Sequence, residues 1–364
     1  MTIQEVTNYL ESIAPLQYQE SYDNAGLIVG NYKDDVSGVL VCLDSTEEIV
    51  DEAIERNCNL IVAHHPIVFS GLKKITGKNY VEKTVIKAIK NDIAIYAIHT
   101  NLDNMLNGVN EIIGRKLGLI NTQVLSQSSN NLRKLITYVP LEYVEKVRDS
   151  LFDSGAGKIG NYDECSFSSM GEGTFRAGDD TNAFIGEKGK RHLETEQKLE
   201  VIYAIDKQSA ILSSLSNSHP YEVVAYDILQ LQNINSDVGA GLIGDLENGI
   251  DEITFLKSLK TTMKTDCVRY TDLRGRQIKK VAVCGGSGSF LLKDAIRQKA
   301  DVFITGDFKY HEFFDAENRI VIADVGHFES EQYTIELLVD KLKEKFTTFA
   351  VCFTEVNTNP VNYL

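Results

Sequence analysis

The chain of 364 residues contains seven histidines, and four of them lie in short polar clusters that follow apolar segments. His64 and His65 are adjacent, and Pro66 breaks the segment behind them. Adjacent residues of a regular strand point to opposite faces, so both imidazoles face one site only where the strand ends. Adjacent histidines chelate a single ion poorly and suit two neighbouring ions, one each. The alternative is a turn that carries two solvated imidazoles.

A second polar cluster, HTNLD, follows another apolar segment. If the strand continues through it, His99, Asn101 and Asp103 share one face. Asp103 is then a hard oxygen ligand, and His99 is either a ligand or a donor that orients one. The alternative is a helix-capping or Asx-turn role for Asn101 or Asp103.

The segment DVGHFESE places His327 four residues before Glu331, in front of an apolar stripe at helical spacing. The stripe consists of Ile335, Leu338, Val339, Leu342 and Phe346. The same spacing directs Glu331 inward. A carboxylate is favourable at a helix N-terminus, but an inward-facing one beside a histidine also requires a cation. Capping alone accounts for Glu329 or Ser330 better than for His327 and Glu331 together.

Three imidazoles and two carboxylates can therefore serve two divalent metal cations per subunit. The five predicted ligands are His64, His65, Asp103, His327 and Glu331, with Glu331 as the bridge. Two ions about 3.5–4 Å apart can activate a water and neutralise developing negative charge. Mixed nitrogen and oxygen ligation is compatible with Zn, Fe, Mn, Co or Ni.

Two weaker patterns also follow apolar segments. The glycine-rich turn CGGSGSF (284–290) could present backbone N–H groups to a phosphate, although it lacks the GxGxxG spacing and the P-loop lysine. A tight strand-to-helix turn explains it equally well. In TGDFKYHE, His311 is a candidate general acid or base, with a helix-start histidine as the alternative.

Continuous Val/Ile/Ala segments alternate with helical patterns on both sides of these clusters, which predicts an α/β protein with two halves built on mainly parallel sheets. The predicted strands are 36–44, 59–66, 93–103, 279–286, 300–308, 319–327 and 349–356. Ligand sites in such sheets gather at the carboxyl ends of the strands. The polar clusters lie at these ends.

The middle of the chain follows a different order, β-α-β-β-α-β, which is the ferredoxin-like arrangement. We therefore predict an inserted ferredoxin-like α+β domain at 128–233 that interrupts a core of 1–127 and 234–364. The glycine-rich stretch 171–190 is expected to be an extended hairpin or a loop.

The charge balance is acidic, with 37 basic against 52 acidic residues and a net charge of −15. This balance disfavours nucleic-acid binding and suits cation capture. No apolar run is long enough for a membrane span, and the N-terminus lacks a signal-peptide pattern. Six cysteines without a CxxC pair are expected to be buried small hydrophobes, which predicts a reduced, cytoplasmic location.

Taken in order, YDNAGL, AHHPIVF, HTNLD, GGSGS, TGDFKYHE and DVGHFESE resemble the GTP cyclohydrolase 1 type 2 homolog family, also called Nif-three-like proteins. The insertion is similar to that of the longer bacterial members, which resembles CutA and PII-type proteins. The resemblance implies a dinuclear metal site with His65 and Asp103 on one ion, His64 and His327 on the other, and Glu331 on both. It also implies a toroidal homohexamer. His99, Asn101 and His311 fall in family motifs as residues near the site.

The leading functional hypothesis is a metal-dependent hydrolase that acts on a nucleotide or related small heterocycle. The resemblance implies ring opening of GTP with release of formate, with His311 or His99 as candidates for proton transfer. One alternative is a metal-binding regulatory or scaffold protein without turnover. Another is a metal-dependent phosphoesterase.

Overall fold

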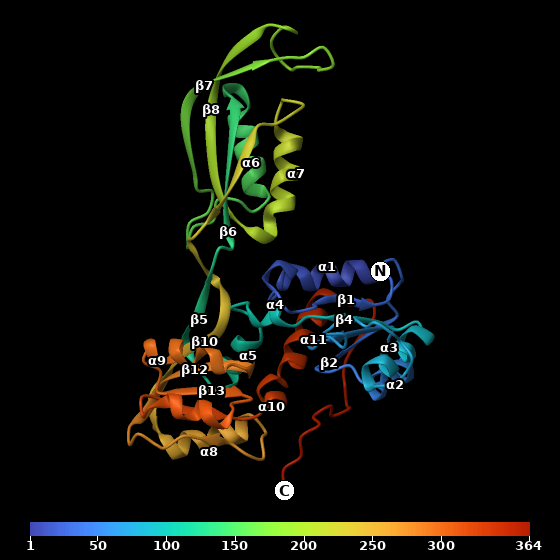
Figure 1. Ribbon diagram of the computed structural model, residues 1–364, viewed down its shortest axis with the longest axis vertical. Helices are drawn as coiled ribbons and strands as arrows, with labels where there is room; N and C mark the ends of the chain where they lie inside the picture. Colours follow the sequence, from blue (N-terminus) through green and yellow to red (C-terminus); the bar gives the residue numbers. More distant parts are fainter. The chain divides into compact units, whose positions relative to one another are not determined.

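The computed structural model describes residues 1–364 and divides them into two compact units. One unit comprises 1–127 and 236–364, and the other comprises 128–235. The first unit is an α/β body with two sheets, and the second has one sheet (Figure 1). No helix in the structure combines the length and the apolar character that crossing a membrane requires.

The first sheet of the α/β unit has the strand order β1-β4-β3-β2-β15. Its strands are β1 (Gly26–Val29), β4 (Ala94–Ala97), β3 (Leu60–Ala63), β2 (Gly38–Cys42) and β15 (Ala350–Phe353). Only β1 runs antiparallel to its neighbour, and the other pairs are parallel. Strands β2, β3 and β4 are buried along their whole length, which explains their continuous apolar sequences.

Helices cover both faces of this sheet. They are α1 (Ile3–Ile13), α2 (Glu47–Glu55), α3 (Tyr80–Lys90) and α11 (Thr334–Lys345). Residues of α2 and α3 pack with Leu40, Ile61 and Ile95 on one face, while α1 and α11 belong to the core on the other face. The apolar stripe predicted behind Glu331 is the buried side of α11.

The second sheet has the order β11-β14-β13-β12-β10-β5 and is mixed, so the prediction of mainly parallel sheets is wrong for this half. Its strands are β11 (Arg269–Tyr270), β14 (Val321–Asp324), β13 (Val302–Gly306), β12 (Gln277–Ser287), β10 (Ile234–Asp251) and β5 (Ile120–Ser129). Strands β12, β13 and β14 are parallel, whereas β10 and β11 pair antiparallel at the two sides.

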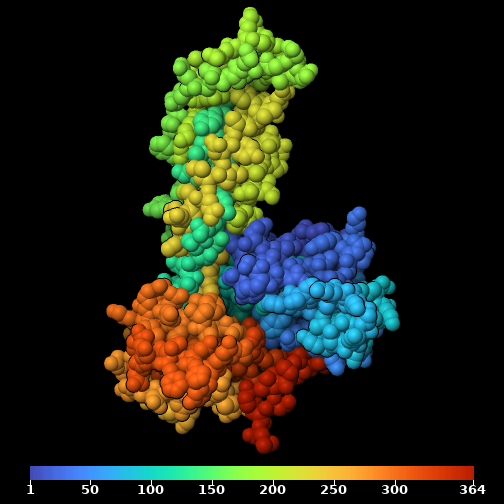
Figure 2. Space-filling view, viewed as in Figure 1, coloured from blue at the N-terminus to red at the C-terminus, as the bar shows by residue number.

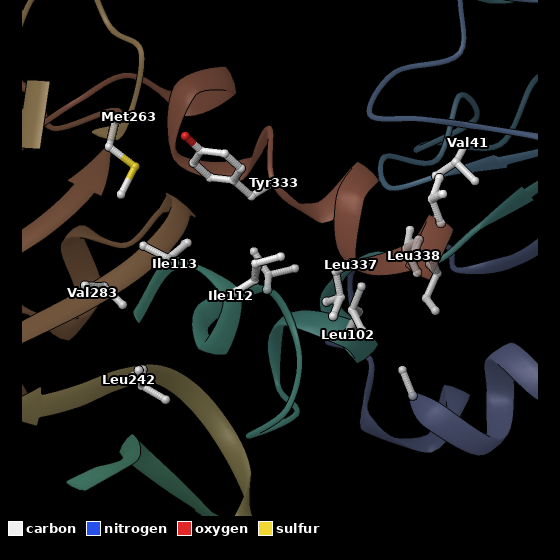
Figure 3. Close-up of a cluster of buried hydrophobic side chains, with 14 of the residues drawn as sticks. Val41, Leu102, Ile112, Ile113, Leu242, Met263, Val283, Tyr333, Leu337 and Leu338 are labelled. Carbon is white, nitrogen blue, oxygen red and sulfur yellow. The ribbon is translucent and has the colours of Figure 1, made fainter. Parts of the chain in front are cut away.

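Further helices and turns complete the α/β unit. They are η1 (Leu16–Tyr18), α4 (Thr100–Asp103), α5 (Val109–Lys116), α8 (Glu252–Thr262), η4 (Ser289–Leu291), α9 (Leu292–Arg297), η5 (Tyr310–Ala316) and α10 (His327–Glu331). One continuous core joins the two sheets: Ile112 of α5 and Leu337 of α11 lie between Val41 of the first sheet and Val283 of the second (Figure 3). Close packing of this kind holds the strand ends of both sheets at fixed distances from one another.

The other unit contains one antiparallel sheet of order β7-β8-β6-β9 and two helices, connected in the order β-α-β-β-α-β. Its elements are β6 (Leu132–Pro140), η2 (Leu141–Tyr143), α6 (Val144–Asp153), β7 (Ser166–Arg176), β8 (Arg191–Ala204), η3 (Ile205–Lys207), α7 (Gln208–Ser218) and β9 (Tyr226–Leu231). A separate core contains side chains of both helices and one face of the sheet. Strands β7 and β8 stay paired out to Arg176 and Arg191, so the glycine-rich stretch is the end of a hairpin.

Candidate metal centre

The five predicted ligands converge in the α/β unit, although they come from three distant segments of the chain. His64 and His65 follow the carboxyl end of β3, and Asp103 ends α4. His327 and Glu331 begin and end the short helix α10, which follows β14. The carboxyl ends of parallel strands from two sheets therefore supply the centre, as expected for ligand sites in α/β folds.

The carboxylate of Glu331 lies among the three imidazoles. Its Oε2 atom is 3.0 Å from His65 Nε2 and 3.1 Å from His327 Nε2. These two ring nitrogens are 3.4 Å apart. On the other side, His64 Nε2 is 3.5 Å from Asp103 Oδ1 and 3.7 Å from Glu331 Oε1.

The opposite nitrogen of each imidazole is held by an oxygen acceptor. His64 Nδ1 contacts the carbonyl oxygen of Ile98 at 2.8 Å. A carbonyl only accepts, so this nitrogen carries the proton and Nε2 presents a lone pair. His65 Nδ1 lies 2.8 Å from Asp44 Oδ1, and His327 Nδ1 lies 2.6 Å from Asp307 Oδ2. Oxygen acceptors on Nδ1 direct the Nε2 lone pairs towards a metal in many protein sites.

Three buried atoms at the centre have no hydrogen-bond donor: His64 Nε2, Asp103 Oδ1 and Glu331 Oε2. His64 is 0% exposed and Glu331 is 3% exposed, so bulk water does not satisfy them. An unpaired buried acceptor costs about 1–3 kcal/mol, and more when it is charged. A cation bound between these buried acceptors would satisfy all of them. His64, His65 and Glu331 bring ligand atoms within 4.8 Å of one another.

Without a cation, protons take its place. Burial disfavours the imidazolium form of His65, but Asp44 and Glu331 outweigh burial and raise its pKa to about 10. For His327 burial again opposes protonation, and Glu331 together with Asp307 raises the pKa to about 9. Burial raises the pKa of Asp103 to about 7. Burial also opposes ionisation of Glu331, but the histidines hold its pKa well below the usual value.

Two glycines allow the ligands to approach one another. Gly286 has φ of 64°, and a Cβ at this position would overlap Glu331 Oε1. A Cβ at Gly306 would lie 2.8 Å from the backbone nitrogen of His327. A larger residue at either position would displace α10, so glycine is required by space at both positions and by its positive φ at Gly286.

A cavity of about 1050 Å³ opens beside the centre. Its lining includes His65, His99, His327 and Glu331 together with C-terminal residues such as Asn359 and Tyr363. In Figure 2 the C-terminal residues, coloured red, are exposed beside both halves of the α/β unit. The C-terminal segment also contacts the centre indirectly, because the Thr358 hydroxyl donates to Asp44 Oδ2 at 2.8 Å.

The HTNLD segment does not continue as a strand. Strand β4 ends at Ala97, and α4 begins at Thr100, so the shared face predicted for His99, Asn101 and Asp103 is wrong. Asn101 is buried and braces the turn, since its Oδ1 accepts from His99 N at 2.9 Å and its Nδ2 donates to Ala14 O at 2.7 Å. Helical geometry nevertheless brings Asp103 to His64.

Of the two histidines predicted for proton transfer, the structure places only His99 beside the centre. The His99 ring centroid is 5.3 Å from those of His64 and His65, and its Nδ1 lies 2.8 Å from Asp23 Oδ1. His311 lies in the exposed turn η5, where its ring contacts Tyr310 and Phe314, and it does not line the cavity. The chain turns away after β13, so proximity in sequence to Asp307 did not bring His311 inward.

The glycine-rich segment 284–290, which includes the end of β12, does not offer its glycine N–H groups to a phosphate. The backbone N–H groups of Gly285, Gly286 and Gly288 donate to Asn110 Oδ1, Ser330 Oγ and Thr305 Oγ1, each at 2.9 Å. These donors are consumed inside the protein, and the alternative of a tight turn is the correct one.

Sequence reasoning missed the three carboxylates that orient imidazoles: Asp23, Asp44 and Asp307. Asp44 and Asp307 stand just behind the ends of β2 and β13, so their position at a strand end was an available signal. Asp23 lies in a turn that precedes the antiparallel strand β1, and nothing local in the sequence marks it. Its pKa falls to about 2, because hydrogen bonds from His99 and Thr100 outweigh the opposing effect of burial.

Comparison with known proteins gives a consistent result along the whole chain. A model of the Duf34/NIF3 (NGG1p interacting factor 3) family matches residues 1–360. A Staphylococcus epidermidis protein named GTP cyclohydrolase 1 type 2 homolog is 35% identical over 369 residues, covering 100% of both chains. A Bacillus subtilis protein of the same name is 37% identical over 367 residues, covering 99% of this chain and 98% of the relative.

A solved structure is also similar. The crystal structure of a Bacillus cereus protein related to NIF3 superposes with a TM-score of 0.85 at 36% sequence identity. The superposition covers 100% of this chain and 99% of the other. The similarity to these proteins in sequence and in mixed α/β fold therefore extends over both compact units.

Proposed function

The chain belongs to the Duf34/NIF3 family, and from this membership and the geometry of its centre we propose that it is a hydrolase dependent on two divalent cations. The proposed ligands are His64, His65, Asp103, His327 and Glu331. Zn, Fe, Mn, Co and Ni all suit this donor set of imidazole and carboxylate groups.

One observation carries the proposal: buried acceptors face one another with no donor between them. Hydrogen bonds fix Nδ1 of His64, His65 and His327 to oxygen atoms, so their lone pairs point at the carboxylates of the centre. A purely structural cluster of this burial would pair its acceptors with donors. Divalent cations are partners that fit this arrangement of acceptors.

The distances suggest how the ligands divide between two ions. His64 Nε2 groups with Asp103 Oδ1 and Glu331 Oε1, at 3.5 and 3.7 Å. His65 and His327 group around Glu331 Oε2, at 3.0 and 3.1 Å. This division differs from the one implied by the resemblance, which joins His65 to Asp103 and His64 to His327. In both divisions Glu331 is the bridge.

When bound, such cations polarise a substrate oxygen and provide a nucleophile from water at neutral pH. The protein residues hold the geometry for that chemistry. Asp44 and Asp307 fix the ring planes of His65 and His327. His99 has Nδ1 bound to Asp23, which leaves Nε2 as the atom proposed to deliver a proton to a departing nitrogen of the substrate.

The proposed reaction is hydrolytic opening of a heterocyclic ring, the class named in the relatives as GTP cyclohydrolase. Two C–N bonds at one ring carbon are hydrolysed, each with one water, and that carbon leaves as formate. The test incubates purified protein, loaded separately with Zn, Mn, Fe or Co, with guanine, guanosine, GMP and GTP. We expect formate from at least one of these purines.

Metal content is measured on the same samples, so that an inactive preparation is distinguished from an empty one. The His219→Gln variant is the matched control, because His219 belongs to the other compact unit. It should retain both metal and activity, whereas His99→Gln should retain metal and lose activity. Full metal occupancy without formate from any purine would refute the ring-opening reaction.

A metal-binding regulatory or scaffold protein is a second candidate, favoured by the separate unit at 128–235. That unit has its own core and a cavity of about 600 Å³, as a ligand-sensing domain would require. Its strand order supports a ferredoxin-like assignment. Thermal stabilisation by metals without hydrolysis of any substrate would favour this candidate over the hydrolase.

We also propose the toroidal homohexamer and the cytoplasmic location that the family resemblance and the sequence imply. All six cysteines are free in the structure, which suits a reducing compartment. Light scattering coupled to gel filtration should give six times the chain mass of 40.6 kDa. A monomer at micromolar concentration would contradict the hexamer.

A further inference from the structure

The cavity beside the centre has an acidic lining. Seven of its side chains are carboxylates, and Arg269 is the only permanently cationic one. Even with two divalent cations bound, negative charges would exceed positive charges. A lining of one sign raises the local concentration of ligands of the opposite sign and repels those of the same sign.

The single arginine is already engaged. Its guanidinium forms an ion pair with Asp324, donates to Phe308 O at 3.0 Å and lies 5.4 Å from the ring centroid of Phe313. A protein that binds a polyphosphate usually offers free Arg or Lys side chains for bidentate contacts. This cavity offers none.

Backbone donors do not replace the missing cations. The glycine-rich turn beside the centre contributes Gly285 to the cavity lining, but its N–H groups donate to Asn110, Ser330 and Thr305. The glycine N–H groups that would hold a phosphate at such a strand-to-helix turn are therefore occupied.

Aromatic rings are the other prominent feature of the lining. Tyr22, Phe69, Tyr80 and Phe290 line the cavity and are 62%, 51%, 67% and 67% exposed. The Phe69 ring lies 6.1 Å from that of Tyr22 and 6.3 Å from that of His99. Exposed rings beside a polar centre provide stacking surfaces for a planar ligand.

We propose that this cavity takes a planar, uncharged heterocycle, as a free base or nucleoside, and excludes a polyphosphate chain. Phe69 provides the stacking surface next to the centre, and the carboxylates repel phosphate groups. This inference rests on the proposed function, because it names the substrate class of the same site. It departs from the triphosphate named in the relatives.

The test measures binding rather than turnover, so that it is independent of the proposed reaction. Guanosine, GMP and GTP are titrated calorimetrically into the full-length protein loaded with zinc, and metal content is measured again after each titration. We expect guanosine to bind about tenfold tighter than GTP or more, because like charges repel in a confined site. Raising the salt concentration should strengthen GTP binding by screening that repulsion.

Four variants separate the stacking from the charge. Phe69→Ala should weaken guanosine binding about tenfold or more, while Phe69→Tyr preserves it. Phe353→Ala, which removes a ring that is 55% exposed outside the cavity, is the matched control and should change nothing. Glu20→Gln removes one lining carboxylate and should improve GTP binding without affecting guanosine.

GTP binding tighter than guanosine, with an affinity that falls as salt rises, would overturn the proposal. Failure of all three ligands to bind would overturn it as well. Neither result bears on the metal ligands or on formate release, which are judged by metal content and product analysis. The proposed function and this substrate class can therefore fail separately.

Discussion

Each compact unit contains a buried histidine with one ring nitrogen bound to a backbone carbonyl, and the two histidines differ in what the other ring nitrogen contacts. In the unit 128–235, His219 Nε2 lies 3.0 Å from the Tyr138 carbonyl, and its Nδ1 accepts from Tyr221 N at 3.1 Å. In the α/β unit, His64 donates through Nδ1 to Ile98 O, and its Nε2 has no donor. Both side chains are buried. A lone pair without a partner, rather than burial, therefore distinguishes His64 as a candidate ligand.

The electrostatic environments differ in the same way. Burial is the main influence on His219 and lowers its pKa. Burial acts in the same direction on His65, but two carboxylates outweigh it and raise the pKa to about 10. Burial keeps His219 neutral in one unit, whereas the other unit concentrates negative charge around His65 that cations or protons balance.

The substitution Glu331→Gln should have the largest effect on the difference between the two units. The amide keeps the shape but removes the charge and the bridging oxygen, so bound metal should fall from about two ions to fewer than one per chain. Mass spectrometry of metals on purified protein measures the effect. The matched variant His219→Gln should keep full occupancy and lose only stability, by about 1–3 kcal/mol, because it leaves buried partners unpaired. Equal metal content in both variants would contradict the contrast.

Chelation should destabilise one unit and leave the other unchanged. A cation present at 1,000 times its dissociation constant contributes about 4 kcal/mol to the folded state. Calorimetric scans with and without chelator should therefore lower the melting temperature of the α/β unit by roughly 8–16 °C. The transition of the unit 128–235 serves as the internal reference. A shift of both transitions would mean that the cations act elsewhere.

The stability of metal-free protein should depend on pH with opposite sign in the two units. The pKa values of His65 and His327 are raised to about 10 and about 9, so their contribution is complete below about pH 6.5 and is lost as pH rises through 9 and 10. The slope is about 1.4 kcal/mol per pH unit for each proton. The lowered pKa of His219 makes its contribution fall as pH drops below about 6.5.

Urea unfolding of apoprotein at pH 5.5, 7.5 and 10 measures both trends. Metal-loaded protein is the control, and the loss between pH 7.5 and 10 should disappear in it, because the cations replace the protons. Apoprotein that is equally stable at pH 7.5 and 10 would contradict the assignment of protons to His65 and His327.

The sequence predicted which residues come together at the centre, because the ends of buried strands can be recognised in it. Continuous apolar segments mark β2, β3, β4, β13 and β14, and the polar residues behind them are the ones that meet in space. Strand β10 was not predicted, because its glycines and acidic residues have low strand propensity. It is held in the sheet by pairing with β12. The pattern of β12 to β14 gives no sign that antiparallel strands flank them.

The roles of the orienting residues could not be predicted in the same way, although Asp44 and Asp307 also follow strand ends. Asp44 and Asp307 contact histidines that lie 21 and 20 residues away, and Asp23 contacts one that lies 76 residues away. Local patterns explain each of them as a turn or a strand end. The position of His311 outside the cavity has the same origin, because its direction depends on the turn that follows Asp307.

Removing an orienting carboxylate should weaken metal binding without abolishing it. Asp44→Asn leaves a group that can still contact His65 Nδ1 but no longer supplies charge, and outer partners of this kind typically change affinity about 10–100-fold. Competition with a chromophoric chelator measures the change. Glu194→Gln alters the carboxylate beside His192 in the other unit, at 2.9 Å, and should leave metal affinity unchanged. An unchanged affinity in Asp44→Asn would show that His65 needs no orientation.

The smallest effect is expected for Thr358, and it tests whether the C-terminal segment supports the metal centre. Thr358 donates to Asp44 Oδ2 at 2.8 Å, and Asp44 Oδ1 in turn holds His65 Nδ1. Thr358→Val keeps the shape of the side chain and removes this donor, whose loss should cost about 0.5–1.5 kcal/mol and weaken metal binding roughly twofold to tenfold. Thr358→Ser should restore the affinity, because it keeps the hydroxyl. If both variants bind metal as tightly as the original protein, the C-terminal segment only covers the cavity and does not support the centre.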